Sequence, residues 1–279
     1  MSELQNPDAK ESARPQGALS PLCPPRPGED GEPSPPTASE KAPGKVAPGD
    51  PVAICLASMR YAEAPRIGCV GDTGTGKSRA MKALTAGWLA RNPGVVLACD
   101  KGGASGFEGQ RRISVTDLQL HPMAAASRAV VFTGDLAAGV DPDPEEVARL
   151  AWRLRARRCG SLVVVDELKW CARAAWWKKG VRWLPQICSE GRKHDVGVLW
   201  GTQSPQDAPR EAIEEAGLLV VFRLAGLGVR CLRDRNYLEG MPDGTLEGLP
   251  GEESPPAGRG RCVILRRGRA WDGRFHRFP

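Results

Sequence analysis

The sequence has 279 residues, of which 41% are hydrophobic and 26% are charged, and its formal net charge is +6. A chain of this length and composition can bury a substantial core, which excludes a wholly disordered protein. No apolar segment follows the initiator methionine and no run of eighteen apolar residues occurs, so we expect neither a secretion signal nor a transmembrane segment.

The first fifty residues differ in composition from the rest. They are rich in proline, serine, glycine and glutamate, and they carry eight acidic and five basic side chains, which leaves +9 on residues 51–279. Such a segment cannot bury enough apolar surface to offset the entropy lost on ordering. We therefore expect a disordered Pro-rich tail over 1–50, either simply solvated or a docking arm with polyproline II character, and one folded domain over 51–279.

From residue 51 onward, apolar runs of strand length alternate with helical segments. This pattern is typical of an α/β domain with a mostly parallel central sheet flanked by helices. The predicted strands are Val52–Leu56, Ile67–Val70, Val95–Cys99, Ala129–Thr133, Leu162–Val165, Val196–Trp200 and Leu218–Phe222. One helix is well marked, with Asp143 as N-cap, Pro144 at its first position and Gly160 after its end.

The nine cysteines never occur in C-x-x-C spacing, and several fall within apolar strands. This distribution indicates small core residues in a reducing compartment and favours neither a disulfide framework nor a zinc site. The three histidines are too scattered along the chain to indicate metal ligation.

The strongest motif fits the phosphate-binding pattern G-x-x-x-x-G-K-[ST] and consists of Gly71, Asp72, Thr73, Gly74, Thr75, Gly76, Lys77 and Ser78. Its glycines allow several backbone N–H groups to point into one concavity. Lys77 is expected to reach the β- and γ-phosphates of ATP, and Ser78 to occupy one coordination position on Mg²⁺. An apolar run ending at Val70 and a helical segment from Ser78 to Arg91 flank the loop in the required order.

Two later strand ends supply candidates for hydrolysis. Asp166 and Glu167 follow the apolar run 161–165, and Gln203 follows the run 196–200 by three residues. Ligands of open α/β sheets bind at the carboxyl ends of the strands. We expect Asp166 to hold Mg²⁺, Glu167 to polarise the attacking water, and Gln203 to contact both the γ-phosphate and that water. No N-K-x-D motif follows the loop, which disfavours a GTPase.

With these motifs the chain resembles the FtsK-HerA superfamily of ring-shaped, DNA-pumping ATPases. The resemblance rests on the loop 71–78, on Asp166-Glu167, on the stretch 190–193, and on Thr202-Gln203-Ser204-Pro205. Asp100-Lys101-Gly102 is similar to the D-P-K-G element of that family without its proline, and residues 246–263 are weakly similar to its closing L-P-x-G segment.

The resemblance implies a RecA-like P-loop NTPase core, a homo-hexameric ring, ATP with Mg²⁺, and movement of double-stranded DNA through a central channel. It also implies that Arg192, eleven residues before Gln203, acts on the γ-phosphate bound by a neighbouring subunit. The alternative for Arg192 is an ordinary solvent-facing side chain.

Two basic segments remain open in their role. Residues 169–183 contain five basic and four tryptophan side chains and no acid, which suits either DNA contact or a helix with its tryptophans in the core. Residues 259–277 carry seven arginines and one aspartate, and Cys262–Leu265 with Ala270–Phe275 indicate a hairpin that serves DNA contact, partner docking or solubility. Residues 240–258 are predicted to be a flexible connection.

Among members of the superfamily, a compact chain without a predicted membrane span most resembles the genome-packaging ATPases of tailless, membrane-containing viruses. This implies capsid or membrane vertex proteins as partners and a location in the host cytoplasm or the virion. The alternatives are a plasmid or phage DNA mobilisation or segregation ATPase, and a nucleotide-dependent assembly factor that does not move DNA.

Overall fold

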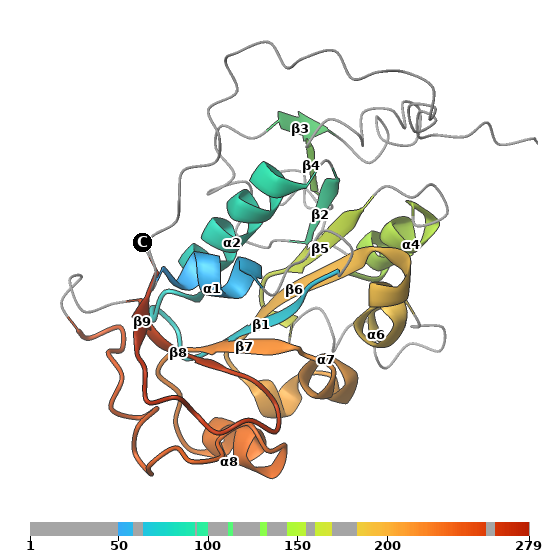
Figure 1. The fold of residues 1–279 in the computed structure, drawn as a ribbon. Coiled ribbons are helices and arrows are strands. Elements are labelled where there is room, and N and C mark those ends of the chain that lie inside the picture. The colour runs from blue at the N-terminus through green and yellow to red at the C-terminus, as the bar shows by residue number, and fades with distance from the viewer. Residues whose placement is uncertain are drawn as a thin grey trace, which may run out of the picture.

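The structure is a computed structural model, shown in Figure 1, and it describes nine parts of the chain. These are residues 50–57, 64–92, 94–99, 111–113, 129–132, 144–154, 160–168, 183–254 and 260–278. For 111–113 and 129–132 it describes the backbone alone. The expected tail before residue 50, Asp143, the Asp100-Lys101-Gly102 element and the basic residues 169–182 lie outside the described residues.

A single sheet runs through the described residues in the order β3-β4-β2-β5-β6-β1-β7-β8-β9. All neighbours from β3 to β7 are parallel, whereas β8 and β9 pair antiparallel at one edge. The strands are β1 (Arg66–Val70), β2 (Val95–Cys99), β3 (Arg111–Ile113), β4 (Ala129–Phe132), β5 (Ser161–Val165), β6 (Val196–Thr202), β7 (Leu218–Val221), β8 (Arg261–Leu265) and β9 (His276–Arg277).

Helices cover both faces of this sheet (Figure 1). They are α1 (Pro51–Ala57), α2 (Lys77–Arg91), α4 (Pro144–Leu154), α6 (Trp183–Glu190), α7 (Arg210–Glu214) and α8 (Leu227–Asp234), with short 3₁₀ turns η3 (Gly191–His194) and η4 (Pro205–Asp207). Two apolar clusters separate the layers: α1 and α2 pack in one, and α4, α6, α7 and α8 pack in the other. In β5, Val163 and Val165 belong to one cluster while Leu162 and Val164 belong to the other, because successive side chains alternate between the faces.

The predicted α/β fold with a mostly parallel sheet is therefore confirmed, and six of the seven predicted strands are present within a residue or two. The short edge strand β3 was not predicted, because its three residues Arg-Arg-Ile carry no alternating or continuous apolar pattern. No helix among the described residues is long and apolar enough to cross a membrane.

The predicted strand Val52–Leu56 is wrong, since these residues form the helix α1. The Asp50 carboxylate accepts a hydrogen bond from the Val52 backbone N–H at 2.8 Å, and Pro51 occupies the first helical position. Asp followed by Pro is a helix-start signal, and here it overrides the β-propensity of the valine and isoleucine. The helix packs on α2 at Gly87, where an added Cβ would lie 2.4 Å from the Leu56 Cδ1.

Two predictions for the C-terminal part also need correction. Residues 240–254 are not a loose connection, because Leu246 and Leu249 are only 2% and 5% exposed and belong to the main apolar cluster. The hairpin exists, but β8 pairs with β9, Cys262 opposite His276, while the predicted partner 270–275 lies in the connection between the strands.

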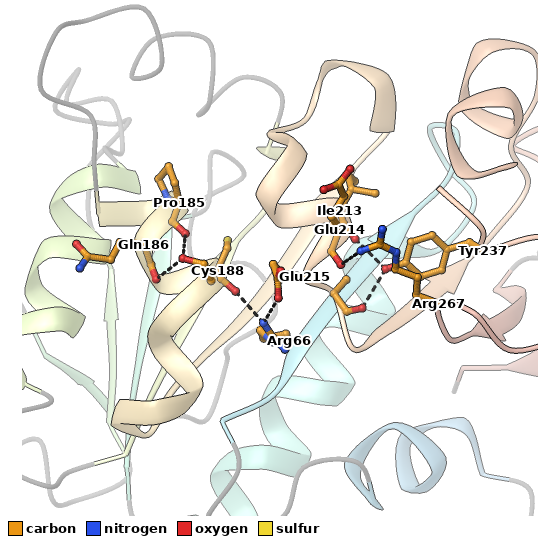
Figure 2. Close-up of polar contacts among 11 residues, drawn as sticks. Arg66, Pro185, Gln186, Cys188, Ile213, Glu214, Glu215, Tyr237 and Arg267 are labelled. Atoms are coloured by element: carbon orange, nitrogen blue, oxygen red, sulfur yellow. Dashed lines mark hydrogen bonds and ion pairs between the residues drawn. The ribbon is translucent and has the colours of Figure 1, made fainter. Parts of the chain in front are cut away.

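Hydrogen bonds near the amino end of β1 join α6, α7 and the residues that follow α8 (Figure 2). The hydroxyl of Tyr237, a fully buried residue, donates toward the carbonyls of Ile213 and Ala216 at 2.8 and 2.9 Å. The Arg66 Nη1 donates to the Glu215 carboxylate at 2.6 Å and to the Cys188 carbonyl at 3.2 Å. These contacts tie α6, α7 and β1 to the chain that follows α8.

Replacing Tyr237 by phenylalanine leaves two buried carbonyls without this donor. We expect Tyr237→Phe to lower the free energy of unfolding by about 1–3 kcal/mol in urea denaturation at neutral pH. The matched control is Thr245→Val, which removes an exposed hydroxyl that donates to the Pro242 carbonyl, and we expect it to change stability by less than about 0.5 kcal/mol. Equal effects of the two substitutions would contradict a stabilising role for the buried network.

The pH dependence provides a second readout of the same hydroxyl. Burial raises the pKa of Tyr237 to about 12, whereas the unfolded phenol titrates near 10. Because the unfolded state loses this proton first, the wild-type protein loses stability as the pH rises from about 10 toward 12, and Tyr237→Phe lacks that loss. The gap in stability between the two proteins should therefore narrow in this alkaline range.

Candidate functional site

The phosphate-binding loop lies at the carboxyl end of β1, between β6 and β7. Its first residues are fixed to both neighbouring strands: the Gly71 N–H donates to the Thr202 carbonyl at 3.2 Å, and the Asp72 N–H donates to the Arg223 carbonyl at 2.8 Å. An added Cβ on Gly71 would lie 2.7 Å from the Phe222 Cβ. The loop is therefore clamped by backbone contacts that only glycine permits at its first position.

The later glycines give the loop its curvature. Gly74 and Gly76 have φ values of 71° and 110°, in the left-handed region that side chains disfavour. Gly76 immediately precedes α2, whose N-terminus has no side-chain cap. The Thr75 hydroxyl donates to the Asp72 carbonyl at 2.8 Å and closes the turn. The first N–H groups of a fifteen-residue helix thus point toward the concavity where an anion would bind.

Lys77 lies folded back across the loop. Its side chain is 7% exposed, and its Nζ donates to the Asp72 carbonyl at 2.7 Å. Burial lowers the pKa of Lys77, an effect that the negative charges of Glu167, Asp166 and Asp72 oppose. The hydrogen bond to Asp72 uses one of the three N–H donors of the ammonium. A bound phosphate would accept hydrogen bonds from the other two.

The structure brings Ser78 and Asp166 together, as the motif predicts for a shared metal ion. The Ser78 hydroxyl lies 3.4 Å from the Asp166 Oδ2, although these residues are on different elements, α2 and the end of β5. The Asp166 backbone N–H donates to the Cys99 carbonyl at 3.0 Å, which fixes the start of the turn after β5. A hydroxyl and a carboxylate are hard oxygen donors of the kind that Mg²⁺ prefers.

Glu167 points toward β6 from a strained backbone conformation. Its φ is 54°, which non-glycine residues rarely adopt. One carboxylate oxygen, Oε1, accepts hydrogen bonds from the Thr202 hydroxyl at 3.1 Å and from the Gln203 backbone N–H at 3.3 Å. Thr202 is fully buried and also accepts from the Ser204 N–H at 3.1 Å. This threonine, which sequence reasoning did not assign, orients the predicted catalytic carboxylate; its place in the T-Q-S-P stretch was the available signal.

Gln203 joins the end of β6 to the phosphate-binding loop. Its Oε1 accepts a hydrogen bond from the Thr73 hydroxyl at 2.9 Å. Together with the contact of its backbone to Glu167, this places Gln203 between the loop and the acidic pair. A side chain here would respond both to a ligand in the loop and to the position of Glu167.

Arg192 is the one predicted site residue that the structure does not bring to the loop of its own chain. It is exposed in η3, just before the amino end of β6, whereas the loop lies at the carboxyl end of the sheet. The seven residues of β6 separate the two ends by about 23 Å. Arg192 therefore lies outside the candidate site of its own chain.

A segment near the C-terminus also contacts the loop, which local sequence patterns hardly indicate. Arg223, after β7, forms an ion pair with Glu253, and the Gly260 N–H donates to the Thr75 carbonyl at 3.1 Å. An added Cβ on Gly74 would lie 2.8 Å from the Cβ of Glu252. Residues 251–254 and 260 thus border the predicted nucleotide site; the weak similarity of 246–263 to an L-P-x-G element was the only indication.

No family model matches the chain, and no curated protein matches it by sequence. Solved structures match it by fold. The genome packaging NTPase B204 from Sulfolobus turreted icosahedral virus 2, in complex with AMPPCP, gives a TM-score of 0.54 at 14% identity over 78% of this chain and 99% of that chain. Its complex with ATP-gammaS gives 0.54 at 15% identity, over 79% and 98%.

The pCW3 conjugation coupling protein TcpA, in its monomer form with ATPgS, gives a TM-score of 0.50 at 15% identity. The match covers 78% of this chain and 60% of that chain. At these identities the likeness establishes the fold. It is an α/β P-loop NTPase fold, as the sequence motifs predict.

Substitution of the buried Lys77 is expected to abolish nucleotide binding without lowering the stability of the protein. Replacing it by methionine removes a desolvated charge but keeps a side chain of similar length, so we expect Lys77→Met to leave the melting temperature without nucleotide unchanged or higher. Saturating Mg·ATP should stabilise the wild-type protein, by about 2.7 kcal/mol at a hundredfold excess over Kd, and should not stabilise Lys77→Met.

Thermal denaturation with and without Mg·ATP measures both effects. Lys82→Met, five residues further along α2, is the matched control and should keep the ATP-dependent shift. A Lys77→Met protein that is still stabilised by ATP would show that the loop does not depend on this amine.

Proposed function

We propose that this chain is an ATPase that moves double-stranded DNA and, within that class, a genome-packaging ATPase of a virus. The observation that supports the proposal is that the loop 71–78, Asp166, Glu167 and Gln203 lie together at the carboxyl end of the parallel strands. The fold supports the finer assignment, because a protein described as a genome packaging NTPase matches over 99% of its own length.

The proposed Mg²⁺ would be held by the Ser78 hydroxyl and Asp166, whose oxygens already face one another across 3.4 Å. When bound, Mg²⁺ would neutralise charge on the phosphates and align them for in-line attack. Lys77 and the N–H groups of the loop would supply the remaining positive potential, and the burial of Lys77 strengthens its interaction with an anion.

Glu167 is the proposed general base. Its carboxylate would accept a proton from a water molecule as that water attacks the γ-phosphorus and the bond to the β-phosphate oxygen breaks, releasing ADP and phosphate. The contacts with Thr202 and the Gln203 N–H use one of its oxygens, Oε1, and so fix the direction of the other. Gln203 would sense the γ-phosphate, because its side chain lies against Thr73 of the loop.

Arg192 is proposed to complete the site of a neighbouring subunit in a homo-hexameric ring. Its exposed position at the amino end of β6 excludes contact with its own loop but leaves the guanidinium accessible to a second copy. An arginine supplied in this way stabilises the charge that develops on the transferred phosphoryl group. Capsid or membrane vertex proteins are the proposed further partners, in the host cytoplasm or the virion.

A second candidate function is DNA mobilisation. A structure described as a conjugation coupling protein shares the fold over 78% of this chain, which favours this alternative within the same mechanism. Both candidates require that DNA controls hydrolysis, so one experiment separates them from a nucleotide-dependent assembly factor that does not move DNA.

That experiment is steady-state ATP hydrolysis by the full chain, with and without duplex DNA, over a series of salt concentrations. We expect DNA to raise the turnover rate several-fold and the stimulation to fade as salt rises, since phosphate contacts release counterions. Lys77→Met controls for contaminating ATPases. Turnover that is indifferent to DNA at every salt concentration would refute the translocase and leave the assembly factor.

Two variants test the assigned roles in the same assay. Glu167→Gln should keep Mg·ATP affinity and lose about 10²–10⁴-fold in kcat, because the amide cannot accept the proton. Arg192→Ala should keep affinity and lose about 10³-fold in kcat if the residue acts across the ring. Wild-type turnover in either variant would remove that residue from the mechanism.

A further inference from the structure

The outer edge of the sheet, opposite β3, carries a concentration of positive charge. The nineteen residues 260–278 contain six arginines, one aspartate and no lysine or glutamate, a surplus of five positive charges. This is more than half of the +9 carried by residues 51–279. All six arginines are exposed, and we call them the arginine rim: Arg261, Arg266, Arg267, Arg269, Arg274 and Arg277.

The rim comprises the edge strands and the connection between them: Arg261 lies in β8, Arg277 lies in β9, and the other four arginines lie between these strands. β8 starts beside the phosphate-binding loop, at Gly260, and ends near the amino end of β7, where Leu265 pairs with Leu219. Five residues of antiparallel strand extend over about 17 Å, and a DNA strand carries one charge per 3.4 Å of helix axis. The edge is therefore about as long as five phosphates of one DNA strand, and residues 260–278 carry a surplus of five positive charges.

The connection between β8 and β9 is held in place by the rest of the fold. The Gly268 N–H donates to the Asn236 carbonyl at 3.1 Å, and the Trp271 N–H donates to the Glu239 carbonyl at 2.9 Å. The Arg267 Nη1 donates to the Glu214 carbonyl at 2.9 Å (Figure 2). Because these contacts already order the segment, binding a ligand there costs little additional conformational entropy.

Aromatic rings lie within the rim. The Arg261 guanidinium carbon is 4.3 Å from the centroid of the Phe275 ring, and Trp271 meets the same ring edge-on at 5.4 Å. Phe275 is 41% exposed. A guanidinium stacked on an aromatic face keeps its N–H groups directed outward in the plane, which suits bidentate contact with phosphate oxygens.

We propose that the arginine rim binds the sugar-phosphate backbone of duplex DNA without reading its sequence. The choice of DNA as the polyanion rests on the function proposed above; the surface itself rests on the charge and geometry of residues 260–278. The segment contains no asparagine, glutamine, serine or threonine, so arginine is its main hydrogen-bonding side chain, and arginine is a common ligand of phosphate groups. Phe275 is its one exposed large apolar side chain among the described residues, too little for insertion into a lipid surface.

The test measures binding of a labelled duplex of mixed sequence to the full chain, by fluorescence anisotropy over a salt series. The rim variant is Arg269→Gln, Arg274→Gln and Arg277→Gln together, which avoids Arg261 and Arg267 because they make packing contacts. The matched control is Arg91→Gln, Arg149→Gln and Arg153→Gln, which removes the same charge from α2 and α4. A third protein carries lysine at the three rim positions.

We expect the rim variant to raise the Kd for duplex DNA about tenfold or more at about 0.1 M salt and to flatten the salt dependence by about 2 in log–log slope. The control and the lysine variant should stay close to the wild-type slope, and basal ATP hydrolysis without DNA should be unchanged in all of them. An unlabelled duplex of unrelated sequence should displace the labelled duplex as well as an unlabelled copy of the same sequence does.

Equal losses in the rim variant and the control would overturn the inference, since net charge alone would then govern binding. Wild-type binding in the rim variant would overturn it as well, while leaving DNA-stimulated hydrolysis intact as support for the translocase. A wild-type chain that binds no duplex at any salt concentration would overturn both this inference and the proposed function.

Discussion

The parallel register of β1 between β6 and β7 is the constraint on which the candidate site depends. This register aligns the carboxyl ends of β6, β1 and β7. The Gly71 and Asp72 N–H groups can therefore donate hydrogen bonds to the Thr202 and Arg223 carbonyls. The register itself requires Gly68, since an added Cβ there would lie 2.4 Å from the ring of the buried Trp200. A shift of one residue in β1 would reverse its two faces and remove the loop from the acidic residues.

The charges at this edge of the sheet make a site that is incomplete without an anion. Lys77 is buried at a cost that lowers its pKa, while Asp166 and Glu167 concentrate negative charge a short distance away. A protein gains little stability from such an arrangement, because burying an ammonium with partial compensation is unfavourable. The arrangement is understandable if bound phosphate, together with a metal ion, supplies the missing charges. The strained φ of Glu167 fits the same interpretation of a site built for a ligand.

Local signals predicted most of the fold and the proximity of the loop, Asp166, Glu167 and Gln203. The loop 71–78 and the apolar runs before Asp166 and Gln203 fix elements whose ends must meet in a parallel sheet, so their proximity followed from topology. Local signals marked the T-Q-S-P stretch and the segment 246–263 but not their partners, because a contact between distant segments depends on the assembled fold: Glu253 pairs with Arg223, and Thr202 donates to Glu167. The error at α1 is of another kind, because the Asp50-Pro51 start signal was present and the apolar run was given more weight.

The strand β8 lies next to both the candidate nucleotide site and the proposed DNA-binding surface, the arginine rim. It follows Gly260, whose N–H donates to the Thr75 carbonyl inside the phosphate-binding loop, and its one arginine, Arg261, is exposed at the outer edge of the sheet. An added Cβ on Gly76 would lie 3.0 Å from the Gly260 Cα, so the loop and the start of β8 are in close backbone contact. Gly260 is followed directly by Arg261, the first residue of the arginine rim. The candidate nucleotide site and the arginine rim are therefore joined by direct backbone contact, with no helix between them.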